Sequence, residues 1–573
     1  MAMTEEMRDL ISEIDDGELR QTILKFSRLN RYTGSRDGEE AVDYLMRKLH
    51  SYGIPCHTEE FEFLRSYPVI TRLTVNTEGR EEPIEAMAAV FSGNCDNLTG
   101  EVWYEEDHLS GKTEKEEARR RTLYQDKIVL THRRHGEDVL AAFFAGAKAV
   151  ISIWNSPEDL LHHNMVGTVW GGPTPDKLYR YSHIPAVCIK QKDGRKLAEI
   201  CRSGKKVTAR LTIQMAEKVV KARMPIADIP GERDTFLLVN GHYDSWYEGI
   251  TDNAAANAAQ LECARILWNH RDRLTRSVRF AWWGGHSDGR YAGSTAYADR
   301  HWEELEEKCI GQINQDMFAG HNCQLVCKTT GCMEKTDMLR EWIEDTCGAF
   351  GRLYENLYRS ADESFSGIGL PISMMSTFIP RENSEWMPHW PEAAGPWWHT
   401  VEDSLDKLNE EYLHRDTAVT LRLAAEFTFC RDLPVDMPGF VGRMMDCLGK
   451  VQEQTEDEFD LRDAIGRLSD LQKALLPLQE KLEKGELRDS DPMVKHFAGR
   501  LMRLAYSYGS EYDHDPAYAG ETMFSRFCQM KGLTRENSRP VWYLAVKNQF
   551  IRQKNRLMDQ TRRLLREAQN FER

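Results

Sequence analysis

The hydrophobic and polar positions divide the chain into stretches of different pattern. Residues 39–53 (EEAVDYLMRKLHSYG) carry apolar side chains at helical spacing and end at a glycine, and TEEFEF (58–63) then alternates like a strand. Between residues 83 and 215, short β-like runs such as KIVLTH and AVISIW surround one helical segment, EDVLAAFFAGAKA. This pattern predicts a compact α+β unit inserted after the first helices and strand.

Buried strands then alternate with helices. TFLLVNGHYDS, SVRFAWWGGHS and CIGQINQDMFAG each begin as an apolar strand and end as a polar loop, and NAAQLECARILWNHR has the pattern of a helix. Apolar strands that alternate with helices are typical of a mostly parallel sheet covered on both faces. We therefore predict an α/β fold with a mixed, mostly parallel sheet sandwiched by helices.

Helical patterns dominate from about residue 435 to the end. Leu468, Leu471, Ala474, Leu475 and Leu478 recur at spacings of three and four, so they form one helix face that must be buried within its own bundle or against a partner. The predicted domains are therefore 1–80 with 216–434 for the α/β part, 81–215 for the insert and 435–573 for a helical domain.

Charge and composition exclude several classes of partner. The 573 residues carry a net charge of −16, and no basic stripe stands out, which argues against nucleic acid or an anionic membrane. No apolar run is long enough to span a bilayer, and the N-terminus is polar rather than signal-like. With thirteen scattered cysteines, we expect reduced thiols and a cytoplasmic location. The pair His162-His163 is expected at the surface of the insert.

Four loops hold side chains that could bind a metal. His242 and Asp244 follow one buried strand, and Asp316 ends another. Asp252 opens a helix, and His399 precedes one. Loops at the carboxyl ends of parallel strands meet at one edge of the sheet. Imidazole together with carboxylate is a ligand set for zinc or a similar divalent ion, so these residues are candidate metal ligands.

At this point the sequence resembles a known superfamily, the zinc-dependent aminopeptidases with the glutamate carboxypeptidases and the transferrin receptor. The resemblance covers RYTGSRDGEEAVDYLMRKLHSYG near the start, DKIVLTHRRHGEDVLAAFFAGAKAVISI and HIPAVCIKQKDG in the insert, and the four loops. The insert is similar to a protease-associated domain, and the tail stands where the receptor-like dimerisation domain would be. The resemblance implies a zinc-dependent peptidase and a homodimer formed through the C-terminal helices.

The resemblance also implies roles for individual residues. In the superfamily, two metal ions roughly 3.5–4 Å apart activate a water and polarise the scissile carbonyl. The segment RSADESFSGIGLP (359–371) is similar to a loop near the substrate, with Asp362 at its acidic position. The implied roles are a ligand of the first metal for His242 and Asp316, a bridging carboxylate for Asp252, a ligand of the second metal for His399, and orientation of His242 for Asp244.

The loop GGHSDGRYAGS (284–294) departs from the pattern. It corresponds to a loop with two adjacent glutamates, of which the first is the general base and the second binds the second metal. An alignment anchored on the preceding Trp283 puts His286 at the base position and Ser287 at the ligand position. An alignment anchored on Gly293 puts Ser287 and Asp288 there instead, because the loop is one residue longer.

Chemistry leaves three interpretations of this loop open. Serine is a poor zinc ligand and histidine a good one, so His286 could complete the second metal site with Asp252 and His399. Asp288 could do so instead, or could act as the base. In the third interpretation, only the metal of His242, Asp252 and Asp316 remains. A zinc-bound water with a pKa of about 7 could also attack without a base.

Residues that could contact a substrate surround these loops. Arg290, Arg359 and Arg381 could bind a carboxylate, whereas Glu363 and Glu385 could bind a free amine. Seven tryptophans lie in or near the loops, some in the core and some as a wall for an apolar group: Trp246, Trp282, Trp283, Trp386, Trp390, Trp397 and Trp398. We expect a peptidase or amidase of the aminopeptidase type that acts on a peptide or amide substrate. The alternatives are a glutamate-carboxypeptidase-like enzyme and a non-catalytic dimeric binding protein on the same scaffold.

Overall fold

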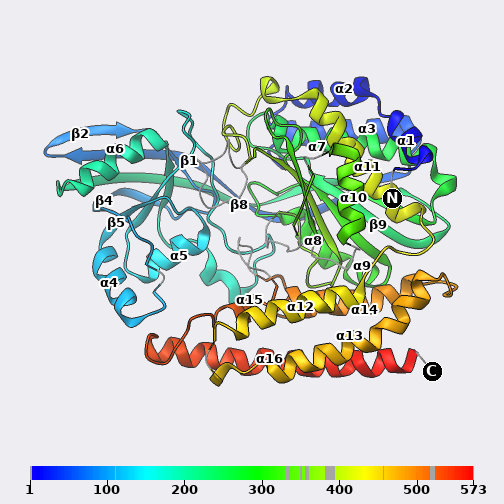
Figure 1. Ribbon diagram of the computed structural model, residues 1–573. Helices are drawn as coiled ribbons and strands as arrows, with labels where there is room; N and C mark the ends of the chain where they lie inside the picture. Colours follow the sequence, from blue (N-terminus) through cyan, green and yellow to red (C-terminus); the bar gives the residue numbers. More distant parts are fainter. Residues whose placement is uncertain are drawn as a thin grey trace.

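One twisted sheet extends through two parts of the molecule, as Figure 1 shows. The computed structural model describes residues 3–109, 111–330, 336–348, 351–354, 361–380, 394–455, 457–515 and 523–571. The strand order is β13-β12-β14-β11-β9-β10-β8-β4-β5-β6-β7-β3, and β1 pairs with β2 and β8 beside this path.

The strands nearest the candidate loops run mostly in parallel. β9 pairs in parallel with β10 on one side and with β11 on the other, and β11 pairs in parallel with β14. β12 is antiparallel to β14. The strands are β9 (Arg233–His242), β10 (Arg276–Trp283), β11 (Cys309–Gln315), β12 (Leu325–Thr330), β13 (Gly351–Tyr354) and β14 (Ile372–Phe378). The predicted mixed, mostly parallel sheet is thus confirmed.

Helices cover this part of the sheet. In α3 the side chain of Ser35 caps the first turn by accepting a hydrogen bond from Gly38 N, and Gly53, with φ of 78°, ends the helix in the left-handed region that favours glycine. α7 is buried along nearly its whole length, and its many alanines suit close packing. The helices are α1 (Glu5–Ser12), α2 (Asp16–Phe26), α3 (Arg36–Tyr52), α7 (Ala255–Asn269), α8 (Ala292–Arg300), α9 (Trp302–Lys308), α10 (Thr336–Cys347) and α11 (Glu410–Phe429).

Two long strands join the parallel region to the insert. β1 (Cys56–Thr77) and β8 (Val207–Ile229) form an antiparallel ribbon. One end of β8 pairs with β10, while the other pairs with β4 of the insert. In Figure 1 this ribbon crosses from the strands at the left to those at the right. The predicted domain boundary at 215/216 falls within β8 and stays a prediction.

The insert has a small core of its own. Its parallel strands pack apolar side chains such as Ile128, Ile151 and Val187 into a cluster separate from the main core. Its elements are β2 (Arg80–Ile84), β3 (Ala86–Ala88), β4 (Cys95–Tyr104), α4 (Glu114–Tyr124), β5 (Lys127–Thr131), α5 (Gly136–Phe144), β6 (Ala149–Ile153), β7 (Ala186–Ile189) and α6 (Gln191–Arg202).

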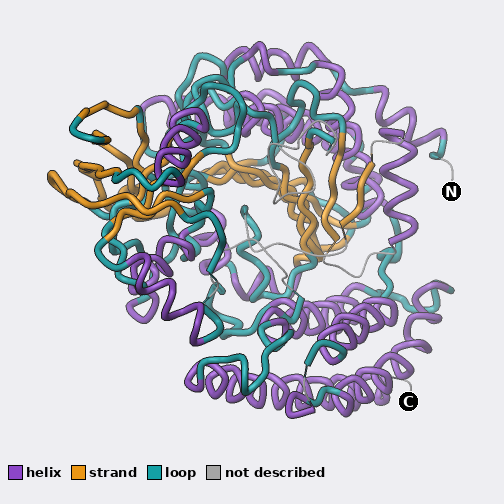
Figure 2. The backbone as a smooth tube through the Cα atoms, turned by 60° about the vertical axis from the view of Figure 1, so that its left-hand side comes forward, coloured by secondary structure: helices purple, strands orange, loops and turns teal. Residues whose placement is uncertain are grey.

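The C-terminal helices pack along one side of the molecule, at the bottom of Figures 1 and 2. They are α12 (Met437–Gln452), α13 (Arg462–Glu483), α14 (Asp491–Tyr506), α15 (Ser525–Cys528) and α16 (Pro540–Phe571). In α13 the side chains of Leu468, Leu471, Leu475 and Leu478 are buried in the chain's own core. The apolar face expected from the sequence is thus covered within the chain, by packing of α13 against α12 and α16.

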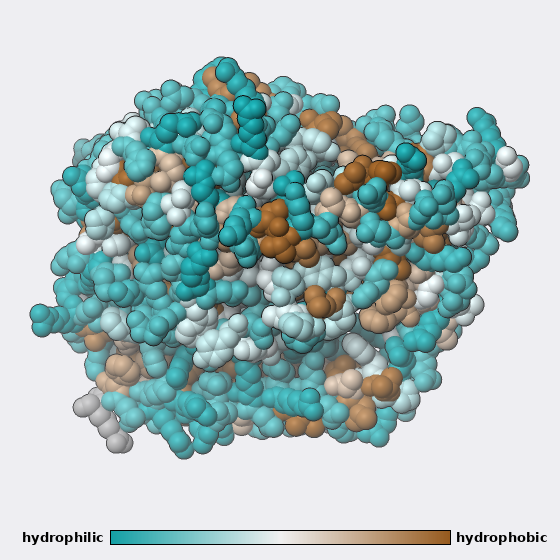
Figure 3. Space-filling model, turned by 180° about the vertical axis from the view of Figure 1, so that it is seen from behind, coloured by the Kyte–Doolittle hydropathy of each residue, from teal (hydrophilic) through white to brown (hydrophobic). Residues whose placement is uncertain are grey.

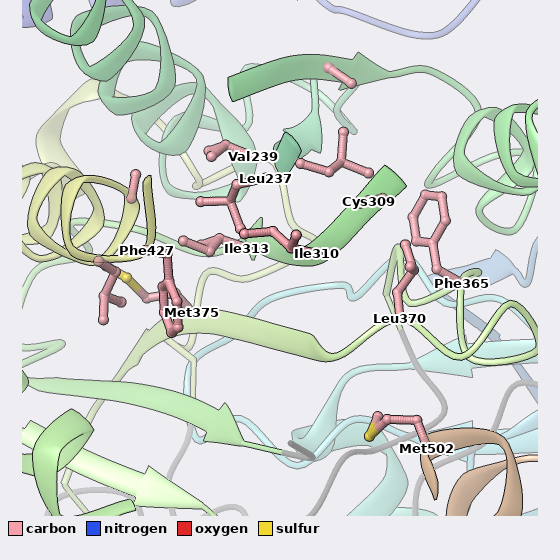
Figure 4. Packing of buried hydrophobic residues seen from close by; sticks show 14 of the residues in the cluster. Leu237, Val239, Cys309, Ile310, Ile313, Phe365, Leu370, Met375, Phe427 and Met502 are labelled. Carbon is pink, nitrogen blue, oxygen red and sulfur yellow. The ribbon is translucent and has the colours of Figure 1, made fainter. Parts of the chain in front are cut away.

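The main core connects the sheet with these helices. In Figure 4, Leu237 and Val239 of β9 and Ile313 of β11 belong to the same cluster as Met502 of α14. The face in Figure 3 is mostly hydrophilic, with several separate hydrophobic areas. Among the described residues, no helix combines the length and apolar character needed to cross a bilayer.

Candidate metal centre

The candidate residues follow the carboxyl ends of neighbouring strands. His242 is the last residue of β9, and Asp316 comes directly after β11. His286 lies three positions past Trp283, which ends β10. Because β10 and β11 both run parallel to β9, the three loops leave the sheet at the same edge.

His242, His286 and Asp316 bring their ligand atoms together. One ligand atom of each lies within 4.8 Å of those of the other two. Nε2 of His242 is 3.2 Å from Oδ1 of Asp316 and 3.1 Å from Oδ1 of Asp252. All four side chains are buried. The structure thus gathers two imidazoles and two carboxylates around one point.

Asp252 lies between this group and His399. Its Oδ1 is the atom near His242, and its Oδ2 is 3.1 Å from Nε2 of His399. The indole Nε1 of Trp398 donates a 2.9 Å hydrogen bond to the same Oδ2. One oxygen is therefore offered to each side, which is how a carboxylate is shared between two metal ions.

A second buried carboxylate, Asp403, fixes the segment that carries Asp252. Its Oδ1 accepts hydrogen bonds of 2.9 Å from the backbone N and from Oγ1 of Thr251, and its Oδ2 accepts one of 3.1 Å from the N of Asp252. Burial, opposed by the hydrogen bonds from Thr251, raises the pKa of Asp403 to about 7. The peptide bond between Asp252 and Asn253 is cis. The hydrogen bonds accepted by Asp403 fix the position of Asp252.

Each imidazole of the first group is oriented by an aspartate. Nδ1 of His242 lies 2.9 Å from the carbonyl oxygen of Asp244, whose carboxylate accepts hydrogen bonds from the backbone N of His286 and of Ser287. Nδ1 of His286 lies 2.9 Å from Oδ2 of Asp362. With Nδ1 donating in both rings, Nε2 is the atom through which each ring would bind a metal ion.

The charges of the cluster call for a cation. Burial alone would lower the pKa of His242, but its bonds to Asp244, Asp252 and Asp316 raise that pKa well above 6.5. Burial likewise opposes ionisation of Asp252, yet His242 and His399 hold its pKa well below 3.8. Nδ1 of His399 is buried with no hydrogen-bond partner among the described residues. A set of imidazoles and carboxylates with open donor atoms fits zinc.

The other acidic residue of the loop, Asp288, lies against Arg65 of β1. Its Oδ2 is 3.1 Å from Nε of Arg65, and its backbone carbonyl accepts a hydrogen bond from the N of Ser66. Burial and the nearby Asp244 raise the pKa of Asp288 to about 8, against the effect of Arg65. The ligand group among the described residues includes His286 and not Asp288.

The predicted surface position of His162 and His163 is wrong. Their exposed fractions are 0% and 4%. The pair lies in the segment between β6 and β7 of the insert, and the N of His163 donates a 2.8 Å hydrogen bond to the carbonyl oxygen of His399. Burial and His399 lower the pKa of His163 to about 3. Apolar neighbours on both sides of the pair, in LLHHNMV, were the available sequence signal for burial.

Aromatic rings surround His399. The ring centres of Trp398 and His399 are 3.8 Å apart. The ring of Trp246 packs edge-on against His399, with ring centres 4.3 Å apart. Trp282 and Trp283 are fully buried, as expected for core residues. Glu363 is also buried. The residues Arg359, Arg381, Glu385, Trp386 and Trp390, also considered from the sequence, lie outside the described residues.

The remaining substrate candidate from the sequence, Arg290, lies outside the ligand group. Its Nη1 donates to Sδ of Met165 at 2.9 Å and to the hydroxyl oxygen of Tyr291 at 3.2 Å. Both contacts involve the insert or the loop itself, so Arg290 helps to hold the loop 284–294 against residues of the insert.

Comparisons with known proteins agree with this geometry. Residues 226–424 match the sequence model of peptidase family M28. The probable leucine aminopeptidase 2 of Trichophyton verrucosum is 26% identical over 299 residues, which are 51% of this chain and 55% of that protein. The chain thus spans about half the length of the curated relatives it matches.

Solved structures show the same fold. An aminopeptidase from Aneurinibacillus sp. strain AM-1 aligns with a TM-score of 0.55 and 23% identity, over 75% of this chain and 97% of that one. A zinc aminopeptidase from Bacillus subtilis aligns with a TM-score of 0.53 and 20% identity, over 72% and 95%. Residues 226–424 therefore resemble peptidase family M28, and the chain has the fold of these solved aminopeptidases.

Proposed function

We propose that the chain is a metal-dependent peptidase or amidase of the aminopeptidase type that uses one or two zinc ions. The observation that carries this proposal is the position of Asp252, which offers one oxygen to the group of His242 and the other to His399. The relatives that it resembles are named as aminopeptidases, and one of them as a zinc enzyme.

The proposed ligands of the first ion are His242, His286, Asp316 and Oδ1 of Asp252. His399 and Oδ2 of Asp252 serve the second. Zinc held by these residues would lower the pKa of a bound water to about 7 and would polarise the scissile carbonyl.

The surrounding residues hold these ligands in place. The carbonyl oxygen of Asp244 accepts a hydrogen bond from Nδ1 of His242, and the carboxylate of Asp362 accepts one from Nδ1 of His286. The Nε2 atom of each ring is therefore the one left to bind a metal. Trp246 and Trp398 pack on His399 and shield that side of the centre from water. In this arrangement Asp288 takes no part in metal binding, because its carboxylate lies against Arg65.

Metal content and turnover test the proposal together. Purified protein is stripped with a chelator, reloaded with zinc, analysed for metal, and assayed on a panel of aminoacyl amides and dipeptides. We expect at least one tightly bound zinc per chain and chelator-sensitive hydrolysis. Asp252→Asn should lose both, whereas Asp234→Asn, an exposed carboxylate paired with Lys308, should lose neither.

The same experiment separates the alternative functions. A protein that binds less than about one metal per several chains and hydrolyses nothing would instead be a binding protein on a peptidase scaffold. Cleavage confined to substrates with an acidic C-terminal residue would indicate a glutamate-carboxypeptidase-like enzyme.

We further propose a homodimer formed through the C-terminal helices, with an insert that is similar to a protease-associated domain. Val541, Leu544 and Ile551 of α16 are 66%, 56% and 46% exposed. Their spacing places them on one face of the helix, and an exposed apolar face is the usual mark of an interface.

A cytoplasmic location is also proposed, and the eleven described cysteines that are free thiols agree with it.

A further inference from the structure

The insert brings two imidazoles to the metal centre. His162 is fully buried, and its ring stacks on Trp154 with centres 3.7 Å apart. The adjacent His163 stacks on Trp246, which in turn contacts His399. The hydrogen bond from the N of His163 to the carbonyl of His399 holds this segment against the loop of the second half of the centre.

Neither ring nitrogen of His162 has a hydrogen-bond partner among the described residues, although both are buried. Buried polar atoms are nearly always paired, and leaving one unpaired costs about 1–3 kcal/mol. A neutral imidazole always presents one lone pair, which a metal ion can accept. Both ring nitrogens of His163 are orphaned in the same way, so each of the two rings needs a water or another ligand from outside the described residues.

The separation of the rings suits a shared metal ion. The ring centres of His162 and His399 are 5.2 Å apart. Imidazole nitrogens bind zinc at about 2.0–2.1 Å, so two rings on one tetrahedral ion have centres about 5 Å apart.

The altered loop leaves the second metal short of a ligand. His399 and Oδ2 of Asp252 provide two donors, while His286 belongs to the first group. Adding His162 gives two imidazoles and one carboxylate, a set found at catalytic zinc sites that keep a position for water.

We propose that His162 of the insert is the third protein ligand of the second metal, with Asp252 and His399. This inference rests on the proposed function, because it assumes that the cluster binds metal. It gives the insert a direct part in the chemistry of the centre. It also explains how the loop 284–294 can lack a second glutamate while Asp252 and His399 are kept.

Cobalt titration of the full-length protein tests this inference without an activity assay. Chelator-treated wild type, His162→Ala and His163→Ala are titrated with Co²⁺, and the visible absorption and bound metal are measured. We expect two ions in wild type. In His162→Ala the affinity for the second should fall at least about 100-fold, while the first is kept. His163→Ala is the matched control, since it removes a neighbouring buried imidazole, and it should keep both.

Two further variants distinguish the loss of a metal ligand from misfolding. His162→Gln keeps a polar side chain of similar size and should lose the second ion like His162→Ala, whereas His162→Glu supplies a carboxylate and should restore it. Unchanged binding of the second ion in both His162→Ala and His162→Gln would overturn the inference and leave the proposed function standing. The inference would also be overturned if wild type bound a single ion and the His162 variants bound that same ion. A wild type that binds no metal would overturn the proposed function as well.

Discussion

At the scale of single residues, the contacts of His286 and Asp288 distinguish the roles of these two residues in the loop 284–294. His286 is oriented by Asp362, which also accepts a 2.6 Å hydrogen bond from Oγ of Ser294. Asp288 is occupied by Arg65 instead. The two residues that the sequence left as rival replacements for the glutamates thus have different surroundings, and substitutions can separate them.

We expect His286→Gln to weaken zinc binding by at least about 100-fold and to abolish hydrolysis, because it removes an imidazole that faces His242 and Asp316. Asp288→Asn should keep its zinc, since the carboxylate of Asp288 lies against Arg65. Zinc dissociation constants of the two variants, measured by competition with a coloured chelator, provide the check. Equal loss in both variants would show that Asp288 is also a ligand.

Some of these residues could be placed at the site from the sequence and others could not, for physical reasons. His242, Asp316 and Asp252 follow local strand–loop patterns, so their convergence could be expected. The environment of His162 depends on a contact with His399, more than two hundred positions away in the chain, which no local pattern encodes. The same holds for Asp288, whose partner Arg65 is supplied by β1.

At the scale of elements, the hydrophobic pattern located the strands and helices of the α/β part, because buried strands are short apolar runs. It did not show that β1 and β8 continue through both parts of the molecule, since their exposed middle alternates weakly between apolar and polar residues. It also left open where the helical tail attaches. A buried ion pair between β10 and α14 provides that attachment.

Asp491→Ala should lower the free energy of unfolding by about 3–5 kcal/mol, because it leaves Arg276 buried and unpaired. Both residues of the pair are fully buried, and two hydrogen bonds of 2.6 and 2.8 Å join them. Asp489→Ala, an exposed neighbour, should cost about 1 kcal/mol or less. Urea denaturation of both variants tests this, and equal effects would contradict it.

Lys495 of α14 gives the tail a dependence on pH. Its Nζ donates to the carbonyl of Leu305, and burial lowers its pKa to about 8 from 10.5. Below pH 8 both folded and unfolded chains carry the proton, so the cost of the buried charge is constant. Between about pH 8 and 10.5 the unfolded chain binds more protons, so stability rises with pH.

Relative to Lys495→Met, wild type should therefore be less stable at pH 7, and the gap should narrow by up to about 3 kcal/mol towards pH 10.5. Urea midpoints of the two proteins, measured in parallel from pH 7 to 10.5, give the difference and cancel the titration of other groups. A gap that does not change with pH would mean that Lys495 keeps an ordinary pKa in the folded protein.

At the scale of the whole molecule, assembly is the property to test. Light scattering should give about twice the chain mass of 66.2 kDa. Replacing Val541, Leu544 and Ile551 together by lysine should yield a monomer, because charged side chains disfavour burial at an interface. Val219→Lys, at an equally exposed position on β8, is the control and should stay dimeric. A wild type that remains monomeric at micromolar concentration would refute the dimer.

The spread of the ligands along the chain has a consequence for biosynthesis. The proposed centre takes residues from five loops and from the insert, and the last of them, His399, follows His242 by more than a hundred positions. While the chain is being made, the centre cannot assemble until His399 has left the ribosome, when the insert and most strands of the sheet have already emerged. Under the proposed function, the chain therefore stays inert while its own unfolded segments are the nearest available substrates, and it gains activity only as those segments become buried.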